Sequence, residues 1–123
     1  MEINKILRND LLDKRITTLL NGDYVYKLHK PEQIKTNIYI EYLVVREEET
    51  NFCGNDSLEN EYLVQIDVFG QNGSLVSTVM SKVKEVLKEK GYRYDYGYET
   101  YEEDTKLYSE KIRIYKEISK EMD

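Results

Sequence analysis

The stretch of residues 59–91 constrains the fold more than any other part of the chain, because the spacing of its apolar side chains changes partway along. Apolar and polar residues alternate over residues 60–69, which is the pattern of a β-strand. An Asn-Gly pair interrupts that alternation. Residues 74–90 then carry apolar side chains three and four positions apart, which predicts an amphipathic helix ending at the next glycine. Ser74 or Asn72 is expected to cap this helix.

The rest of the chain predicts one more helix and several more strands. Apolar residues at roughly helical spacing predict a single helix over about residues 2–20. Alternation with a period of two predicts further strands in the ranges 23–28, 34–47, 92–98 and 107–118.

Two segments show neither period. Residues 47–58 are rich in turn-forming side chains and predict a long loop, which we expect to be mobile in the free protein and ordered in an assembly. Residues 116–123 are highly charged and predict a tail that frays.

These elements predict an α+β fold with a mainly antiparallel sheet of four to five strands and two helices packed on one face. Long strands with one polar face favour antiparallel pairing, with helices covering the other face. The chain has 123 residues and no linker rich in Gly, Pro or Ser. A single domain spanning residues 1–123 is therefore expected.

The charge and the apolar runs exclude several classes of function. The net charge of -6 argues against non-specific binding to nucleic acid, which requires a cationic surface. No apolar run reaches the ~20 residues of a membrane-spanning helix, and the amino-terminal residues do not form a secretory signal. We therefore expect a cytoplasmic protein that does not enter membranes.

No group of residues predicts catalysis, a metal site or a cofactor site. His29 is the only histidine and has no nucleophile or ligand cluster beside it in the sequence. Cys53 is the only cysteine and has Phe52 and Gly54 as neighbours. The acidic runs Glu47–Glu49 and Glu102–Asp104 lack the alternating spacing of a calcium loop. We expect no enzymatic activity.

Tyrosines are the best candidates for a functional surface, since the chain has 12 of them. Aromatic side chains on a sheet can stack on nucleotide bases, but the acidic residues around the 92–98 stripe argue against that use. Packing in an interface or a core is the preferred interpretation. The second faces of two other predicted strands carry apolar side chains that one layer of helices cannot cover. The candidate interface consists of Tyr39, Leu43, Leu63, Phe69, Tyr92, Tyr94, Tyr96 and Tyr98.

A resemblance to a known family rests on four segments. They are the predicted strands Ile38–Val45, Tyr62–Phe69 and Tyr108–Ile114 and the helix over 74–90. The order and spacing of these segments resemble the tail completion proteins of long-tailed phages and prophages, also called tail terminator or head–tail joining proteins. The resemblance covers about residues 3–115, and its most distinctive part is the Val-Gln-Ile-Asp-Val-Phe run that ends at Phe69.

The resemblance implies a structural protein of a virion that assembles in the host cytoplasm. Proteins of this family form rings, commonly hexameric, that cap the tail tube and join the tail to the head at the head–tail junction. The implied partners are further copies of the chain, the tail tube protein and the head connector, with DNA only passing through the lumen. An acidic ring would repel that DNA rather than bind it.

A second hypothesis comes from a different class of protein. The chain could be a small α+β regulatory or ligand-binding module that dimerises through its sheet. A pocket ringed by Tyr92, Tyr94 and His29 would favour that hypothesis.

Overall fold

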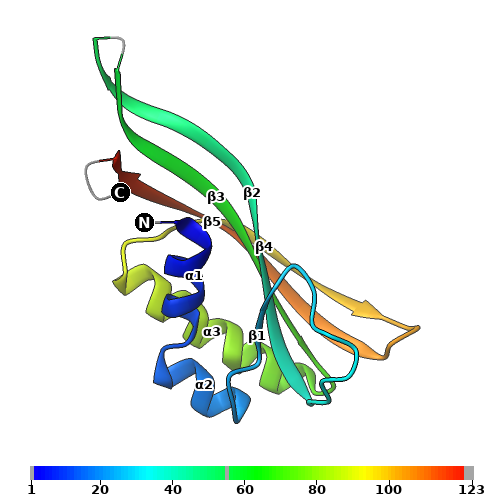
Figure 1. Cartoon of the computed structure of the whole chain (residues 1–123). Helices are drawn as coiled ribbons and strands as arrows, with labels where there is room; N and C mark the ends of the chain where they lie inside the picture. The colour runs from blue at the N-terminus through cyan, green and yellow to red at the C-terminus, as the bar shows by residue number, and fades with distance from the viewer. Residues whose placement is uncertain (1, 55, 121–123) are drawn as a thin grey trace.

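The computed structural model describes residues 2–54 and 56–120. Over these residues the chain forms a five-stranded sheet with three helices on one face (Figure 1). The helices are α1 (Ile3–Leu11), α2 (Lys14–Leu20) and α3 (Gly73–Glu89). The strands are β1 (Val25–Lys27), β2 (Ile38–Cys53), β3 (Asp56–Gly70), β4 (Arg93–Glu102) and β5 (Leu107–Ser119). The predicted α+β class is confirmed.

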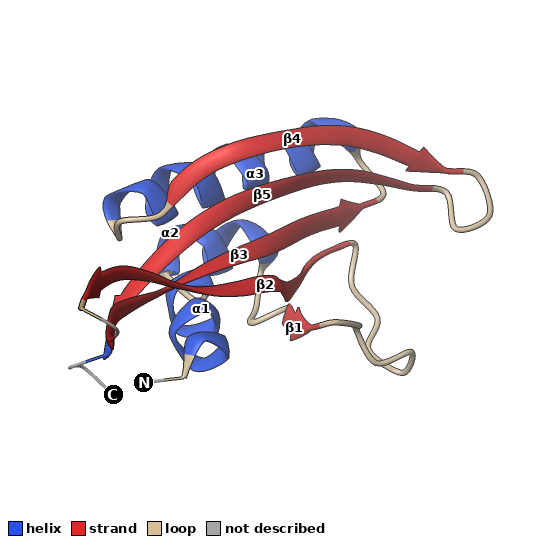
Figure 2. Cartoon of the chain, turned by 90° about the horizontal axis from the view of Figure 1, so that it is seen from above, coloured by secondary structure: helices blue, strands red, loops and turns tan. Residues whose placement is uncertain are grey.

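The strands lie in the order β1-β2-β3-β5-β4. Strand β1 runs parallel to β2, while the pairs β2–β3, β3–β5 and β4–β5 are antiparallel. Figure 2 shows this order from above, with the helices behind the sheet and β1 as a short strand at one edge. The long strand β3 is therefore central, and the prediction of a mainly antiparallel sheet is confirmed.

The core forms between α3 and the central strands. Val79, Val83 and Val86 of α3 are fully buried, as the predicted apolar stripe requires. They belong to one cluster with the helix-facing side chains of β3 and β5. Those side chains are Val64, Ile66, Val68, Ile112 and Ile114. The same alternation that predicted the strands therefore decides which side chains meet the helix.

The turn from β3 into α3 is tight. The Asn72 side chain accepts a hydrogen bond from the Leu75 amide at 3.1 Å, which confirms the predicted cap. A Cβ atom on Gly70 would lie 2.9 Å from a methyl group of Val76 and 3.2 Å from the Asn37 carbonyl oxygen. A side chain at that position would push the helix away from the strand.

The prediction of one helix over residues 2–20 is wrong, because the segment contains two helices. Helix α1 ends at Leu11, and Asp13 caps α2 by accepting a hydrogen bond from the Arg15 amide at 2.9 Å. The Arg15 side chain and amide also hold the pKa of Asp13 down at about 2. An aspartate cap inside an apolar pattern stops one helix and starts the next. Three helices rather than two therefore cover the described sheet.

The prediction of a long loop over residues 47–58 is also wrong. Strands β2 and β3 continue as an antiparallel ribbon, with Thr50 opposite Glu59 and Phe52 opposite Ser57. We call residues 46–54 and 56–59 the β2–β3 arm, and Figure 1 shows it extending beyond the helices. No helix covers the arm, so its side chains need no apolar alternation. The backbone ladder forms without the sequence signal that marks a half-buried strand.

The expected frayed tail is wrong for its first residues. Strand β5 continues to Ser119 and pairs with β3 there, with Ile118 opposite Asn60. Ile118 is buried in the core cluster. Residues 121–123 of the predicted tail lie outside the described part of the chain.

The buried stripe of α3 predicts the effect of one charge. In Val83→Asp a carboxylate without a partner would lie in the core, which costs several kcal/mol against a typical domain stability of about 5–15 kcal/mol. We expect this variant to be unfolded by circular dichroism. Ser81→Asp, on the exposed side of the same helix, should melt close to the wild type. A folded Val83→Asp variant with an unchanged melting temperature would contradict the packing described.

Candidate interaction surface

The face of the sheet opposite the helices, here called the open face, carries a row of charged side chains. Across the strands, Glu41 of β2 lies opposite Asp67 of β3, and Asp67 lies opposite Lys111 of β5. Glu41 and Asp67 are each only 7 % exposed. Two carboxylates at directly opposed positions repel each other, so each needs a partner of its own.

Each of these carboxylates has such partners. Lys111 Nζ lies 3.4 Å from Asp67 Oδ2, and Gln65 Nε2 donates to Asp67 Oδ1 at 3.0 Å. On the other strand, the Lys30 amide donates to Glu41 Oε2 at 2.7 Å. The His29 ring nitrogen Nδ1 lies 3.5 Å from the same Glu41 oxygen. Asp67 is thus paired with a lysine, while Glu41 accepts a backbone hydrogen bond, and both partners come from the same chain.

The network continues one step along the sheet. Arg113 Nε donates to Gln65 Oε1 at 3.1 Å, so that Gln65 connects a guanidinium to the Asp67 carboxylate. The Arg113 guanidinium also lies 5.9 Å from the centre of the Tyr96 ring on β4. The centre of the open face is therefore a connected polar surface rather than an apolar one.

Aromatic rings lie beside this network. The rings of Tyr39 and Phe69 stack with centres 5.2 Å apart, and Lys111 Nζ lies 4.4 Å from the centre of the Phe69 ring. Burial, with the carboxylates of Glu41 and Glu102 adding to it, raises the pKa of Tyr39 to about 12. The Tyr39 and Phe69 rings are thus already packed within one copy of the chain.

Four of the eight candidate interface residues lie on the open face of β2 and β3. Leu63 and Phe69 are buried, and Tyr39 and Leu43 are half-buried. The expectation that all four side chains lie uncovered is wrong, and for two of them the cover is seen: Lys30 lies over the Tyr39 ring and Lys111 over the Phe69 ring. Whether they contact another protein stays a prediction.

The predicted tyrosine stripe is divided between the two faces of the sheet. The pairing of β4 with β5 shifts by one residue between Tyr94 and Tyr96. Before the shift, Tyr94 lies opposite Ile114 on the helix side, and Lys84 of α3 sits 5.1 Å from its ring centre. After the shift, Tyr96 lies opposite Arg113 on the open face and stacks with Tyr98 at 6.5 Å. A β-bulge thus reverses the alternation that the sequence suggested.

The first tyrosine of the stripe is a core residue. Tyr92 is buried, and its hydroxyl donates a hydrogen bond to Asp10 Oδ2 of α1 at 2.8 Å. Burial and that hydrogen bond raise the pKa of Tyr92 well above its usual range. Tyr92 is therefore largely enclosed by its own chain, whereas Tyr94, Tyr96 and Tyr98 are exposed.

Two of the cavities among the described residues lie between α3 and the β4–β5 hairpin. One, of about 690 Å³, lies between the start of α3 and the far end of the β4–β5 hairpin, where Tyr101 and Tyr108 pack with ring centres 4.8 Å apart. The other, of about 440 Å³, lies between the end of α3 and the start of β4. Tyr92 and Tyr94 line this second cavity, but His29 does not. The pocket of Tyr92, Tyr94 and His29 required by the ligand-binding hypothesis is not formed.

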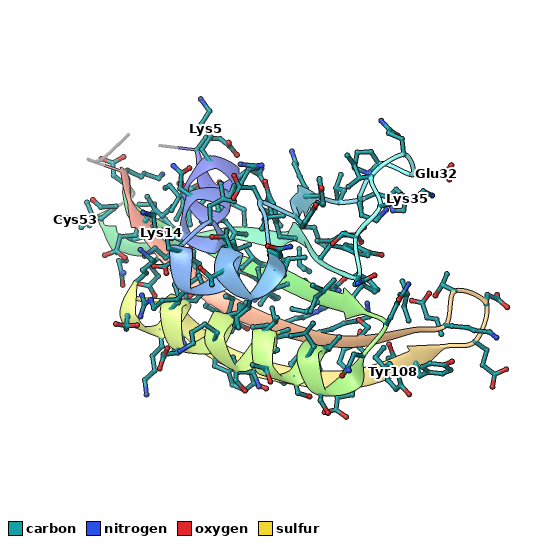
Figure 3. The ribbon with its side chains drawn as sticks, turned by 90° about the horizontal axis from the view of Figure 1, so that it is seen from below. Lys5, Lys14, Glu32, Lys35, Cys53 and Tyr108 are labelled. Atoms are coloured by element: carbon teal, nitrogen blue, oxygen red, sulfur yellow. The ribbon has the colours of Figure 1, made fainter. Side chains whose placement is uncertain are left out.

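The remaining candidate residues are dispersed. Cys53 is exposed at the end of β2, and Figure 3 shows it at the opposite end of the molecule from Tyr108. Among the described residues, no three His, Cys, Asp or Glu side chains form a group that could hold a metal ion. Within the same residues, no helix is both long and apolar enough to span a membrane.

Comparison with known proteins gives one informative result. The chain matches no family model and no curated protein sequence. Among solved structures it is similar to a chain of the structure titled "Virion of native gene transfer agent (GTA) particle". The TM-score is 0.71 at 11% sequence identity, and the match covers 92% of this chain and 91% of that chain. At this identity the similarity establishes a shared fold over nearly the whole length of both chains.

The charged row was not among the predicted site residues. The alternation of Lys111 and Arg113 with Ile112 and Ile114 was visible in the sequence. Their partners Asp67 and Gln65 could not be assigned, because β3 pairs with β5 rather than with the next strand along the chain.

The ion pair in this row gives a stability prediction. Lys111→Met leaves the carboxylate of Asp67 in a site that is largely shielded from water. We expect the free energy of unfolding to fall by about 1–3 kcal/mol in urea titrations. Lys35→Met, in the exposed loop before β2, should change it by less than about 0.5 kcal/mol. Equal stability of the two variants would show that the ion pair between Lys111 and Asp67 contributes no net free energy to folding.

The base of the arm gives a prediction about pH. A hydrogen bond with Glu59, together with burial and the Glu61 carboxylate, raises the pKa of Glu117 above its ordinary value of 4.5. The folded protein therefore holds this proton more tightly than the unfolded chain, and ionised Glu117 destabilises the fold at neutral pH. Glu117→Gln should raise the melting temperature at pH 7 and leave it unchanged at pH 4, below the ordinary value. A rise of equal size at both pH values would exclude charge repulsion as the cause.

Proposed function

We propose that this protein is a structural component of a phage-like virion, acting as a tail completion protein at the junction between tail and head. The observation that carries the proposal is the similarity in fold to a chain of a gene transfer agent virion over 92% of this chain. The order of strands and helix that resembles tail completion proteins points to the same class.

The molecular surface is consistent with assembly into a ring. A closed ring requires one patch of each copy to meet a different patch of the next copy. The two edges of the sheet differ in this way. The edge formed by β4 presents exposed tyrosines, and the part of the sheet near the other edge presents the β2–β3 arm. Beyond Tyr42, β2 has β3 as a partner but no pairing with β1.

The proposed partners are further copies of the chain, in a ring that we expect to be hexameric, with the tail tube protein on one side and the head connector on the other. The net charge of -6 suits a ring through which DNA passes without binding. Assembly would take place in the host cytoplasm, and the finished protein would lie in the virion.

The proposal is tested with tails assembled in the absence of this protein. Adding the purified chain should cap these tails, stop further polymerisation of the tube and allow them to join filled heads, as seen by electron microscopy. Tails that stay uncapped and never join heads at any protein concentration would contradict the proposal.

A pair of variants makes this experiment specific. Tyr96→Ala with Tyr98→Ala removes two exposed rings from β4, and we expect it to reduce capping while the protein stays folded. Lys82→Ala, on the outer side of α3, serves as the control and should cap tails like the wild type. If the two variants cap equally well, β4 is not part of the assembly contact.

A further inference from the structure

The cavity beside α3 has an apolar floor and a basic rim. Its volume of about 440 Å³ falls in the range of sites that take up a buried group. Apolar groups at the floor come from Leu87, Tyr92, Ile112 and Ile114. Charged groups around it come from Lys84, Lys88 and Arg93. Such a cavity favours an apolar side chain that is carried on an acidic segment.

The β2–β3 arm provides a segment of this kind. Phe52 is 58 % exposed near the end of the arm, where a large aromatic side chain has no partner layer to cover it. Residues 46–59 contain five acidic side chains and one basic side chain. The arm is thus complementary in charge to the rim of the cavity and carries an aromatic group that fits an apolar floor.

The cavity and the arm belong to different parts of the surface, although Arg93 at the rim of the cavity lies 3.4 Å from Glu61 of β3, near the base of the arm. The cavity is next to β4 and the arm extends from β2 and β3, with β5 between β3 and β4. The cavity and the arm are different patches with complementary charge, and a contact between two different patches is the heterologous kind that propagates from copy to copy.

We propose that Phe52 of one copy occupies the cavity between α3 and β4 of the next copy, with the acidic arm lying against Lys84 and Lys88. The inference rests on the proposed ring and names the contact that builds it. Aromatic side chains in well-packed pockets are the residues that carry most of the binding energy of an interface. Each copy offers one arm and one cavity, so the contact repeats until the ring closes.

The position of the only cysteine makes a direct test possible. Cys53 follows Phe52 at the end of the arm and is exposed. In Lys88→Cys each copy carries one thiol on the arm and one at the rim of the cavity. A short thiol cross-linker should then give a ladder of dimers, trimers and larger products that stops at the size of the ring. The wild type, with Cys53 alone, cannot be linked beyond a dimer.

Three control variants define the contact. Lys14→Cys, with its new thiol on α2, should give no ladder. Phe52→Asp in the Lys88→Cys chain should reduce the larger products about tenfold or more. Leu58→Asp should not, because Leu58 is also exposed but belongs to the side of the arm opposite Phe52.

The cross-linking is done in concentrated solution and on tails capped with the variant. Absence of the ladder in both settings, or a ladder that Phe52→Asp leaves unchanged, would overturn the contact. If the wild type still caps tails, the proposed function stands while this contact fails. If the ladder forms but tails are never capped, the contact is supported and the function at the tail is contradicted. The contact would also be overturned if another virion protein filled the cavity. In that case the thiol introduced by Lys88→Cys would be cross-linked to that protein, and the ladder would not form.

Discussion

The packing of α3 against β3 and β5 determines the rest of the structure. Its valine stripe accepts the side chains of one face of the sheet and brings β5 beside β3, although α3 and β4 lie between them in the chain. Once Ile66 and Ile112 face the helix, alternation places Asp67 and Lys111 on the opposite face. The hydrophobic contact on one side therefore positions the charged row on the other.

That charged row changes how the molecule can associate. An open sheet face of aromatic and aliphatic residues would be a large apolar patch, and such patches associate with little selectivity. Here the central positions hold an ion pair and hydrogen bonds whose partners come from the same chain. Most of the exposed apolar groups lie instead at the periphery, on β4 and on the β2–β3 arm. Contacts at the periphery are directional, which suits a protein that joins copies side by side and leaves the rest of its surface for other virion proteins.

The sequence was informative where burial on one face imposes a period. Helix α3, strand β3 and the helix-facing side chains of β5 could be predicted because the core selects apolar residues at their positions. The break at Asp13, the β2–β3 arm and the bulge before Tyr96 could not. A helix cap and a one-residue shift in pairing each change the spacing of apolar residues at a single position, so the alternation around them looks continuous. A ribbon exposed on both faces has no apolar alternation to detect. The bulge had the largest consequence for the site, because it moved half of a four-tyrosine stripe to the other face of the sheet.

A tail completion protein must lie at the junction between tail and head in a finished particle. Antibodies against the whole chain, detected with gold in electron micrographs of assembled particles and of isolated tails, would locate it directly. We expect gold at the end of the tail that joins the head, on isolated tails as well as on particles whose heads have been detached. Gold along the capsid shell or at the distal tip of the tail would contradict the proposed location. Purified particles without gold would contradict it as well.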